Sequence, residues 1–209
     1  MQQHQNPWTS MWLDPRGTIR SIVDTDPHYR VLLLAILGGF SQTLSNAAGM
    51  SLGDKVPIPS LFLLILLSGP VNGLLSLYVG GFVLHWVSAK LGGQSTREEI
   101  RAAIAWSWVP LVSTLPLWIV KYILFRDELF LSKKTLIESQ PLASTLYSVI
   151  GFIDVAIAIW SLLLLYNAIG EVNRFSSWRG IAAVLLAGII ITLPVMIIIS
   201  TCMAPMAGG

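Results

Sequence analysis

The chain has 209 residues, of which 54% are hydrophobic and only 11% are charged, whereas an average soluble domain carries roughly 25% charged residues. This composition excludes an ordinary soluble domain and predicts an integral membrane protein. The formal net charge of +2 is too small to indicate nucleic acid as a partner, and the single cysteine, Cys202, excludes a disulfide within the chain.

The amino-terminal segment, residues 1–29, is polar except for one amphipathic stretch. Asp14 followed by Pro15 is typical of a helix N-cap and a first helical position. Isoleucine and valine residues then recur on one helical face, while Arg16 and Arg20 fall on another. This pattern predicts a short helix lying in the lipid headgroup region. The alternative is a cytosolic helix that packs on the loops of the protein.

Five apolar segments follow, and each is long enough to cross a bilayer. We predict an all-α, polytopic membrane domain over residues 30–201 with an external tail at 202–209. The second span is about 45 Å long at 1.5 Å per residue, against a hydrocarbon core of about 30 Å, so it must tilt, kink or emerge. The expected spans are residues 30–49, 61–91, 99–121, 142–170 and 178–201.

Small residues line one face of the second span. Gly69 and Gly73 have the GxxxG spacing that allows two membrane helices to approach closely, and Gly80 prolongs this face. Pro70 lies between the first two and provides a place for a kink. These glycines are therefore the predicted helix-packing residues.

A polar turn at residues 92–101 separates the second and third spans. Its two glycines disfavour continuation of the helix. Ser95 or Thr96 can accept hydrogen bonds from the free N–H groups of the next helix, and Glu98 and Glu99 follow at the distance of a capping box. The turn is predicted to be a hinge between two spans.

The remaining segments are interrupted by proline and polar residues. Pro110 and Pro116 predict a bent third span, whose freed carbonyl groups need partners. The longest loop is expected at residues 122–142, and a short turn at residues 171–178 precedes the last span. Pro194 lies near the middle of that span.

The distribution of basic residues predicts the orientation in the membrane. With five spans, eight lysine and arginine residues fall on the amino-terminal side and five on the other side. An excess of basic charge marks the cytoplasmic side, so the amino terminus is expected in the cytosol and the carboxyl terminus outside. Basic residues of the cytosolic face could contact anionic lipid headgroups. They are Arg16, Arg20, Lys90, Arg97, Arg101, Arg174 and Arg179.

Polar residues near the middle of the spans form a second candidate site, composed of Gln42, Asn72, Ser113 and Asp154. A charged Asp154 at this depth costs at least roughly 2.5 kcal/mol, so it should face the bundle and have a partner. It is either a proton or cation site with Asn72 and Gln42 as neighbours, or a structural link between spans. Lys121 is expected to reach the outer surface, which leaves no basic residue beside Asp154.

No nucleotide-binding loop, zinc-ligand spacing or nucleophile–base set occurs in the sequence. We therefore expect neither enzymatic activity nor a cofactor or metal site.

Three motifs resemble those of a known family. They are DPRGTIR at residues 14–20, LGGQSTR at 91–97 leading to Ala103 and Pro110, and AIG at 168–170 leading to Trp178 and Arg179. The chain resembles the Yip family of Ypt/Rab-interacting, five-span membrane proteins, in particular its short bacterial branch. The resemblance implies a cytosolic amino terminus, five helices, an external carboxyl terminus and location in a bacterial inner membrane.

Unlike the eukaryotic members, which act in membrane trafficking, the chain lacks a long cytosolic amino-terminal region. The leading hypothesis is a non-enzymatic membrane protein that organises the bilayer, or binds lipid or a partner protein, through its cytosolic face. One alternative is a small transporter or channel with its site around Asp154. Another is an accessory subunit whose GxxxG face docks on a larger complex. The possible partners are another membrane protein or a second copy of the chain in a homo-oligomer.

Overall fold

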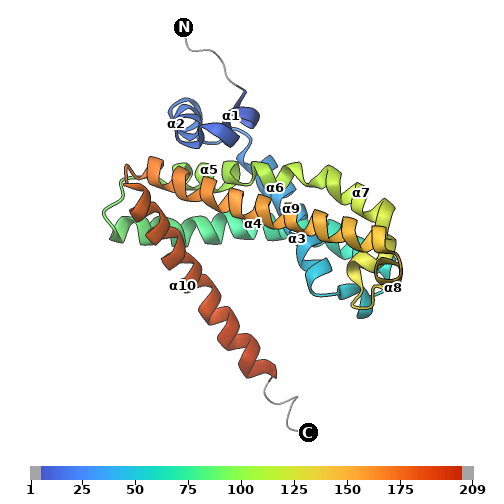
Figure 1. Ribbon diagram of the computed structural model, residues 1–209. Helices are drawn as coiled ribbons and strands as arrows, with labels where there is room; N and C mark the ends of the chain where they lie inside the picture. The colour runs from blue at the N-terminus through green and yellow to red at the C-terminus, as the bar shows by residue number, and fades with distance from the viewer. Residues whose placement is uncertain (1–5, 204–209) are drawn as a thin grey trace.

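The computed structural model describes residues 6–203, except for the side chains of Ser177, Val195 and residues 198–203. Every regular element in this part of the chain is a helix (Figure 1). The α-helices are α1 Pro7–Leu13, α2 Pro15–Thr25, α3 Val31–Gly49, α4 Ile58–Lys90, α5 Arg97–Ser107, α6 Val109–Ser113, α7 Leu115–Phe125, α8 Thr135–Ser139, α9 Pro141–Val172 and α10 Ser177–Met203. Two short 3₁₀ helices are η1 Leu52–Asp54 and η2 Arg126–Phe130.

Four helical stretches of the described chain are long and apolar enough to cross a membrane: Val31–Gly49, Ile58–Lys90, Arg97–Phe130 and Pro141–Val172. The prediction of an all-α, polytopic membrane protein is confirmed at this level. The apolar part of α10 found in the described residues, Trp178–Pro194, is shorter. The fifth predicted span is therefore not established by the fold.

The stretch from α5 to α7 is the centre of the molecule, and its residues 102–110 are all buried. The helices α3, α4 and α9 contact α5 around this centre, and α10 contacts α4 and α9. Figure 1 shows α1 and α2 beside one end of α5 and α9, and shows α10 leading away from the other long helices.

The bend predicted for the third span is present as two breaks, at Trp108 and Thr114. Each break immediately precedes a short helix with proline in its first turn, where the missing N–H is tolerated. Hydroxyl groups supply part of the lost hydrogen bonding, because Ser113 Oγ donates to the Pro110 carbonyl at 2.6 Å and Thr114 Oγ1 to the Leu111 carbonyl at 2.7 Å.

Residues 122–142 are largely helical, which corrects the prediction of a long loop. The end of α7, η2, α8 and the start of α9 occupy this segment. Glu128 accepts hydrogen bonds from the backbone N–H groups of Leu136 and Ile137 and so satisfies the start of α8. Phe125 and Phe130 are buried in one apolar cluster with Ile137. The segment folds because it has its own helix cap and its own core.

The closest helix approach is between α3 and α4. A Cβ atom on Gly39 or Gly73 would collide with the backbone of the facing helix, and one on Gly69 would collide with the ring of Phe40. A Cβ atom on Gly80, by contrast, would meet no atom within 4 Å. The next close contact along α4 is at Gly81, where a Cβ atom would lie 3.1 Å from Arg101 Cγ.

Candidate functional site

Four segments meet at one end of the helices: α1, α2, the turn at residues 91–96 and the turn at residues 173–176. We call them the amino-terminal layer. Asp14 ends α1 and accepts a hydrogen bond from the backbone N–H of Gly17 at 3.0 Å, which confirms it as the N-cap of α2. The layer therefore begins with two helices joined at one capping residue.

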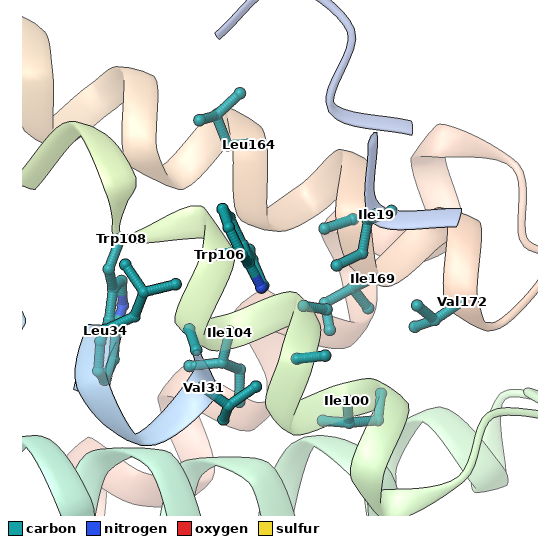
Figure 2. Close-up of a cluster of buried hydrophobic side chains, with 14 of the residues drawn as sticks. Ile19, Val31, Leu34, Ile100, Ile104, Trp106, Trp108, Leu164, Ile169 and Val172 are labelled. Atoms are coloured by element: carbon teal, nitrogen blue, oxygen red, sulfur yellow. The ribbon is translucent and has the colours of Figure 1, made fainter. Parts of the chain in front are cut away.

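The apolar face of α2 packs against the protein itself. Ile19 and Ile22 are buried in the same apolar cluster as Ile169 and Val172 of α9, and Figure 2 shows Ile19 beside Ile169. Their side chains are 0% and 5% exposed, so this face is not available to lipid. The apolar face of α2 therefore packs against α9 and α5, neither against lipid nor against loops, and the headgroup location of the helix stays a prediction.

Two arginines of α2 bind the carboxyl-terminal end of α9. Arg20 donates from Nε and Nη2 to Glu171 Oε1 at 3.0 and 2.8 Å, and from Nη2 to the Glu171 carbonyl at 3.0 Å. Arg16 lies 3.8 Å from Glu171 Oε2 and donates from Nε to Asn167 Oδ1 at 3.4 Å. The end of α9 carries partial negative charge, which adds to the attraction. These guanidinium groups therefore attach the amino-terminal helices to the bundle.

Asn173 joins the two turns of the layer. It is buried, accepts a hydrogen bond from Ser95 Oγ at 2.7 Å, and donates from Nδ2 to the Ile169 carbonyl at 2.9 Å. A Cβ atom on Gly93 would collide with the Asn173 amide, so the second glycine of the turn is needed for this contact. The sequence offered no signal for the pair, because 78 residues separate Ser95 from Asn173.

The capping box predicted for this turn is confirmed. The backbone N–H of Thr96 donates to Glu99 Oε2 at 2.7 Å, and that of Glu99 donates to Thr96 Oγ1 at 3.3 Å. Thr96 and Glu99 are three residues apart in the chain, so this local contact could be predicted from the sequence.

Trp106 connects the layer with the buried centre. Its Nε1 donates to the Tyr29 carbonyl at 3.2 Å, and its ring stacks on the Tyr29 ring at a centroid distance of 6.0 Å. The Trp8 ring of α1 meets it edge-on at 5.8 Å. Figure 2 shows Trp106 surrounded by side chains of several helices.

The seven basic residues predicted for the cytosolic face do not form one patch. Arg16 and Arg20 are half-buried and bound to α9. Lys90, Arg97 and Arg101 lie over aromatic rings of α4. Arg174 and Arg179 are exposed, the first in the turn at residues 173–176 and the second just after it.

In the polar cluster predicted at mid-depth, Asp154 has a partner that the sequence did not indicate. Lys121 Nζ lies 2.5 Å from Asp154 Oδ2. The lysine side chain is only 4% exposed, and its ammonium group lies 4.2 Å from the centre of the Trp118 ring. The prediction that Lys121 reaches the outer surface is wrong. Its apolar stem is covered by protein, and its charge is satisfied inside the bundle.

None of the other members of that cluster makes a hydrogen bond to Asp154 among the described residues. Ser113 is exposed and donates to the Pro110 carbonyl. Within residues 6–203, no hydrogen bond joins Gln42 or Asn72 to Asp154. The polar contact between α3 and the broken third stretch is instead the pair Ser41 and Thr114, whose hydroxyl oxygens lie 3.0 Å apart.

The family model of the Yip1 domain matches residues 9–199. The chain belongs to the Yip1 domain family. Neither the curated proteins nor the solved structures contain a significant match to this Yip1-domain protein.

The match confirms the family inferred from the three short motifs. Its range takes in most of α1, all of α2 and most of α10, so the amino-terminal layer belongs to the Yip1 domain and is not an appendage to it. The Arg20–Glu171 and Ser95–Asn173 contacts both lie inside the matched range.

We expect Asn173→Ala to loosen the layer of this Yip1-domain protein. The change leaves the buried Ser95 hydroxyl without its acceptor, which should destabilise the layer by about 1–3 kcal/mol, whereas the Ile169 carbonyl keeps its hydrogen bond from the backbone N–H of residue 173. Hydrogen exchange of the backbone amides in residues 91–96 should become faster in the variant. Asn46→Ala, an exposed asparagine of α3, is the matched control. Equal exchange in the two variants would contradict the assigned role of Asn173.

Proposed function

We propose that this Yip1-domain protein is a non-enzymatic membrane scaffold that binds lipid or a partner protein through its amino-terminal layer. The main support for this proposal is the attachment of α2 to α9 by the Arg20–Glu171 contacts. These contacts and the Ser95–Asn173 hydrogen bond together hold the two helices and two turns of the layer in one arrangement. A preorganised surface binds with less loss of conformational freedom than separate mobile segments do.

The proposed orientation places this layer in the cytosol of a bacterial cell and the carboxyl terminus outside. It requires α10 to be the fifth span. In support, α10 has 27 residues, about 40 Å at 1.5 Å per residue, which exceeds the roughly 30 Å hydrocarbon core. The larger number of basic residues on the amino-terminal side supports the same orientation.

The alternative of a transporter or channel around Asp154 has narrower support. In its favour, the Asp154 side chain remains 39% exposed and so is not sealed inside the bundle. The contact with Lys121, however, satisfies the carboxylate without a transported ion. We therefore favour a structural role for this pair and the scaffold as the function.

Photo-crosslinking in native membranes tests the scaffold proposal. A photoreactive residue at Arg179, which is exposed beside the layer, should give lipid or protein adducts. The same group at Lys133, which is exposed near the opposite end of α9, should give far fewer. Equal yields at the two positions would refute binding through the layer.

Arg20→Gln provides a second arm of this experiment. The variant loses charge-assisted hydrogen bonds to a half-buried carboxylate, so α2 should detach more often and adducts at Arg179 should decrease severalfold. Faster proteolysis within residues 26–30, the connection between α2 and α3, would show the detachment directly. Arg30→Gln is the control, because Arg30 is exposed and makes no ion pair among the described residues.

A further inference from the structure

A stripe of aromatic side chains runs along one face of α4 near its carboxyl-terminal end. Tyr78, Phe82 and Trp86 are spaced four residues apart, so they lie on one side of the helix. Their exposed fractions are 49%, 56% and 51%. In a membrane helix this stripe would face lipid.

Each ring of the stripe lies under a cation. Lys90 Nζ is 5.9 Å from the centre of the Trp86 ring, Arg97 Cζ is 5.8 Å from that of Phe82, and Arg101 Cζ is 5.2 Å from that of Tyr78. The helix α5 starts just after the turn and contacts α4. Arg97 and Arg101 are four residues apart on α5, as Phe82 and Tyr78 are on α4, so each arginine lies over one ring. We call these six residues the cation–aromatic stripe.

Two cations of the stripe have no ionic partner among the described residues. Arg101 Nη2 lies 2.7 Å from Glu98 Oε1, so its charge is offset within α5. The nearby Glu99 is held by the capping box. Lys90 and Arg97 are exposed and form no ion pair in the described chain. They are therefore the groups in the stripe that can bind an anion.

The length of α4 places the stripe at the membrane surface. Its 33 residues span about 50 Å, so roughly 20 Å of the helix extends beyond a hydrocarbon core of about 30 Å. If the apolar part of α4 enters the hydrocarbon core at Leu61, the core ends near Phe82 and Trp86, which then lie near the headgroups. Tryptophan and tyrosine are enriched at that level of a bilayer.

We propose that Lys90 and Arg97 bind the phosphate of an anionic phospholipid of the surrounding bilayer, with its acyl chains against Phe82 and Tyr78. The rings hold the cations in place, so less side-chain freedom is lost when the lipid binds. The planar guanidinium of Arg97 can donate two hydrogen bonds to one phosphate. The proposal rests on the scaffold function and assigns its lipid-binding part to one edge of the protein.

Native mass spectrometry of the purified protein in detergent tests the site. The probes are phosphatidylglycerol and phosphatidylcholine with identical acyl chains. Each cation near an anionic headgroup contributes about fivefold, so Lys90→Gln with Arg97→Gln should lower the preference for phosphatidylglycerol by about 25-fold. Lys90→Arg with Arg97→Lys, which keeps both charges, should preserve most of it.

Lys55→Gln with Lys133→Gln is the matched control. It removes the same charge from exposed positions outside both the stripe and the amino-terminal layer. This variant should keep the preference for phosphatidylglycerol. Millimolar inorganic phosphate should not displace the lipid, because the free ion lacks acyl chains to contact the rings.

Three results would overturn the lipid site: an unchanged preference in the Lys90/Arg97 variant, an equal loss in the control, or displacement by inorganic phosphate. The crosslinking experiment at Arg179 is independent of these results. Adducts at Arg179 with no lipid preference at the stripe would support the scaffold proposal and refute the lipid site. Lipid preference at the stripe without adducts at Arg179 would keep the lipid site and refute binding through the amino-terminal layer.

Discussion

Gly73→Ala is expected to force α3 and α4 apart and to unfold the protein at a clearly lower temperature. A Cβ atom on Gly73 would collide with the carbonyl oxygen of Ala35 and lie 3.1 Å from the Cα of Gly39. Both obstacles are backbone atoms, which cannot rotate away as a side chain can. Overpacking of this kind typically destabilises by about 1–3 kcal/mol, and we expect the upper end of that range or beyond. Thermal unfolding in detergent, followed by circular dichroism, measures the effect.

Gly80→Ala is the matched control on the same helix. Its Cβ atom would enter open space, and alanine is more favourable than glycine inside a helix by roughly 0.5–1 kcal/mol. This variant should therefore unfold at the same temperature as the parent protein or slightly higher. Equal loss of stability in both variants would show that the α3–α4 contact is not where the structure places it.

The glycines of α4 show how far a spacing rule reaches. The GxxxG spacing identifies a helix face on which close packing is possible, and Gly69 and Gly73 do lie against α3. Gly80 is on nearly the same face, but the partner changes along the helix, and at Gly81 the close neighbour is Arg101 of α5. The point at which two packed helices diverge depends on their crossing angle, which cannot be predicted from the sequence of one helix alone.

Contacts between nearby residues were predictable and distant ones were not. The capping box of Thr96 and Glu99 and the Asp14 cap each involve residues three apart. The partner of Arg20, in contrast, is Glu171, which is 151 residues away. From sequence alone Arg20 is an ordinary solvent-facing arginine of an amphipathic helix. Only the meeting of α2 with the end of α9 turns it into an attachment point.

The depth of Lys121 was misjudged for a related reason. Counting residues from the end of a span depends on placing that end correctly. The predicted third span ended at Lys121, whereas the apolar helical stretch continues to Phe130. Lys121 therefore lies inside the stretch, where its ammonium group contacts Asp154 and the Trp118 ring. The prolines predicted breaks in this stretch, but not where the stretch ends.

Lys121→Met is expected to be the most destabilising change at a charged residue. It leaves the half-buried Asp154 carboxylate without its cation. Removing one partner of a buried ion pair typically costs about 3–5 kcal/mol, and because the carboxylate here is 39% exposed we expect about 2–3 kcal/mol. Lys133→Met, which changes an exposed lysine, should alter the unfolding temperature very little.

Adding Asp154→Asn to Lys121→Met should restore much of the lost stability, because no uncompensated charge remains. A double-mutant cycle of unfolding free energies in detergent measures this coupling directly. Additive losses in the double variant would contradict the ion pair. The single variant Asp154→Asn then separates the two roles of this residue. A structural pair predicts lower stability without any ion flux in proteoliposomes of the parent protein, whereas a transport site predicts flux in the parent that the variant loses.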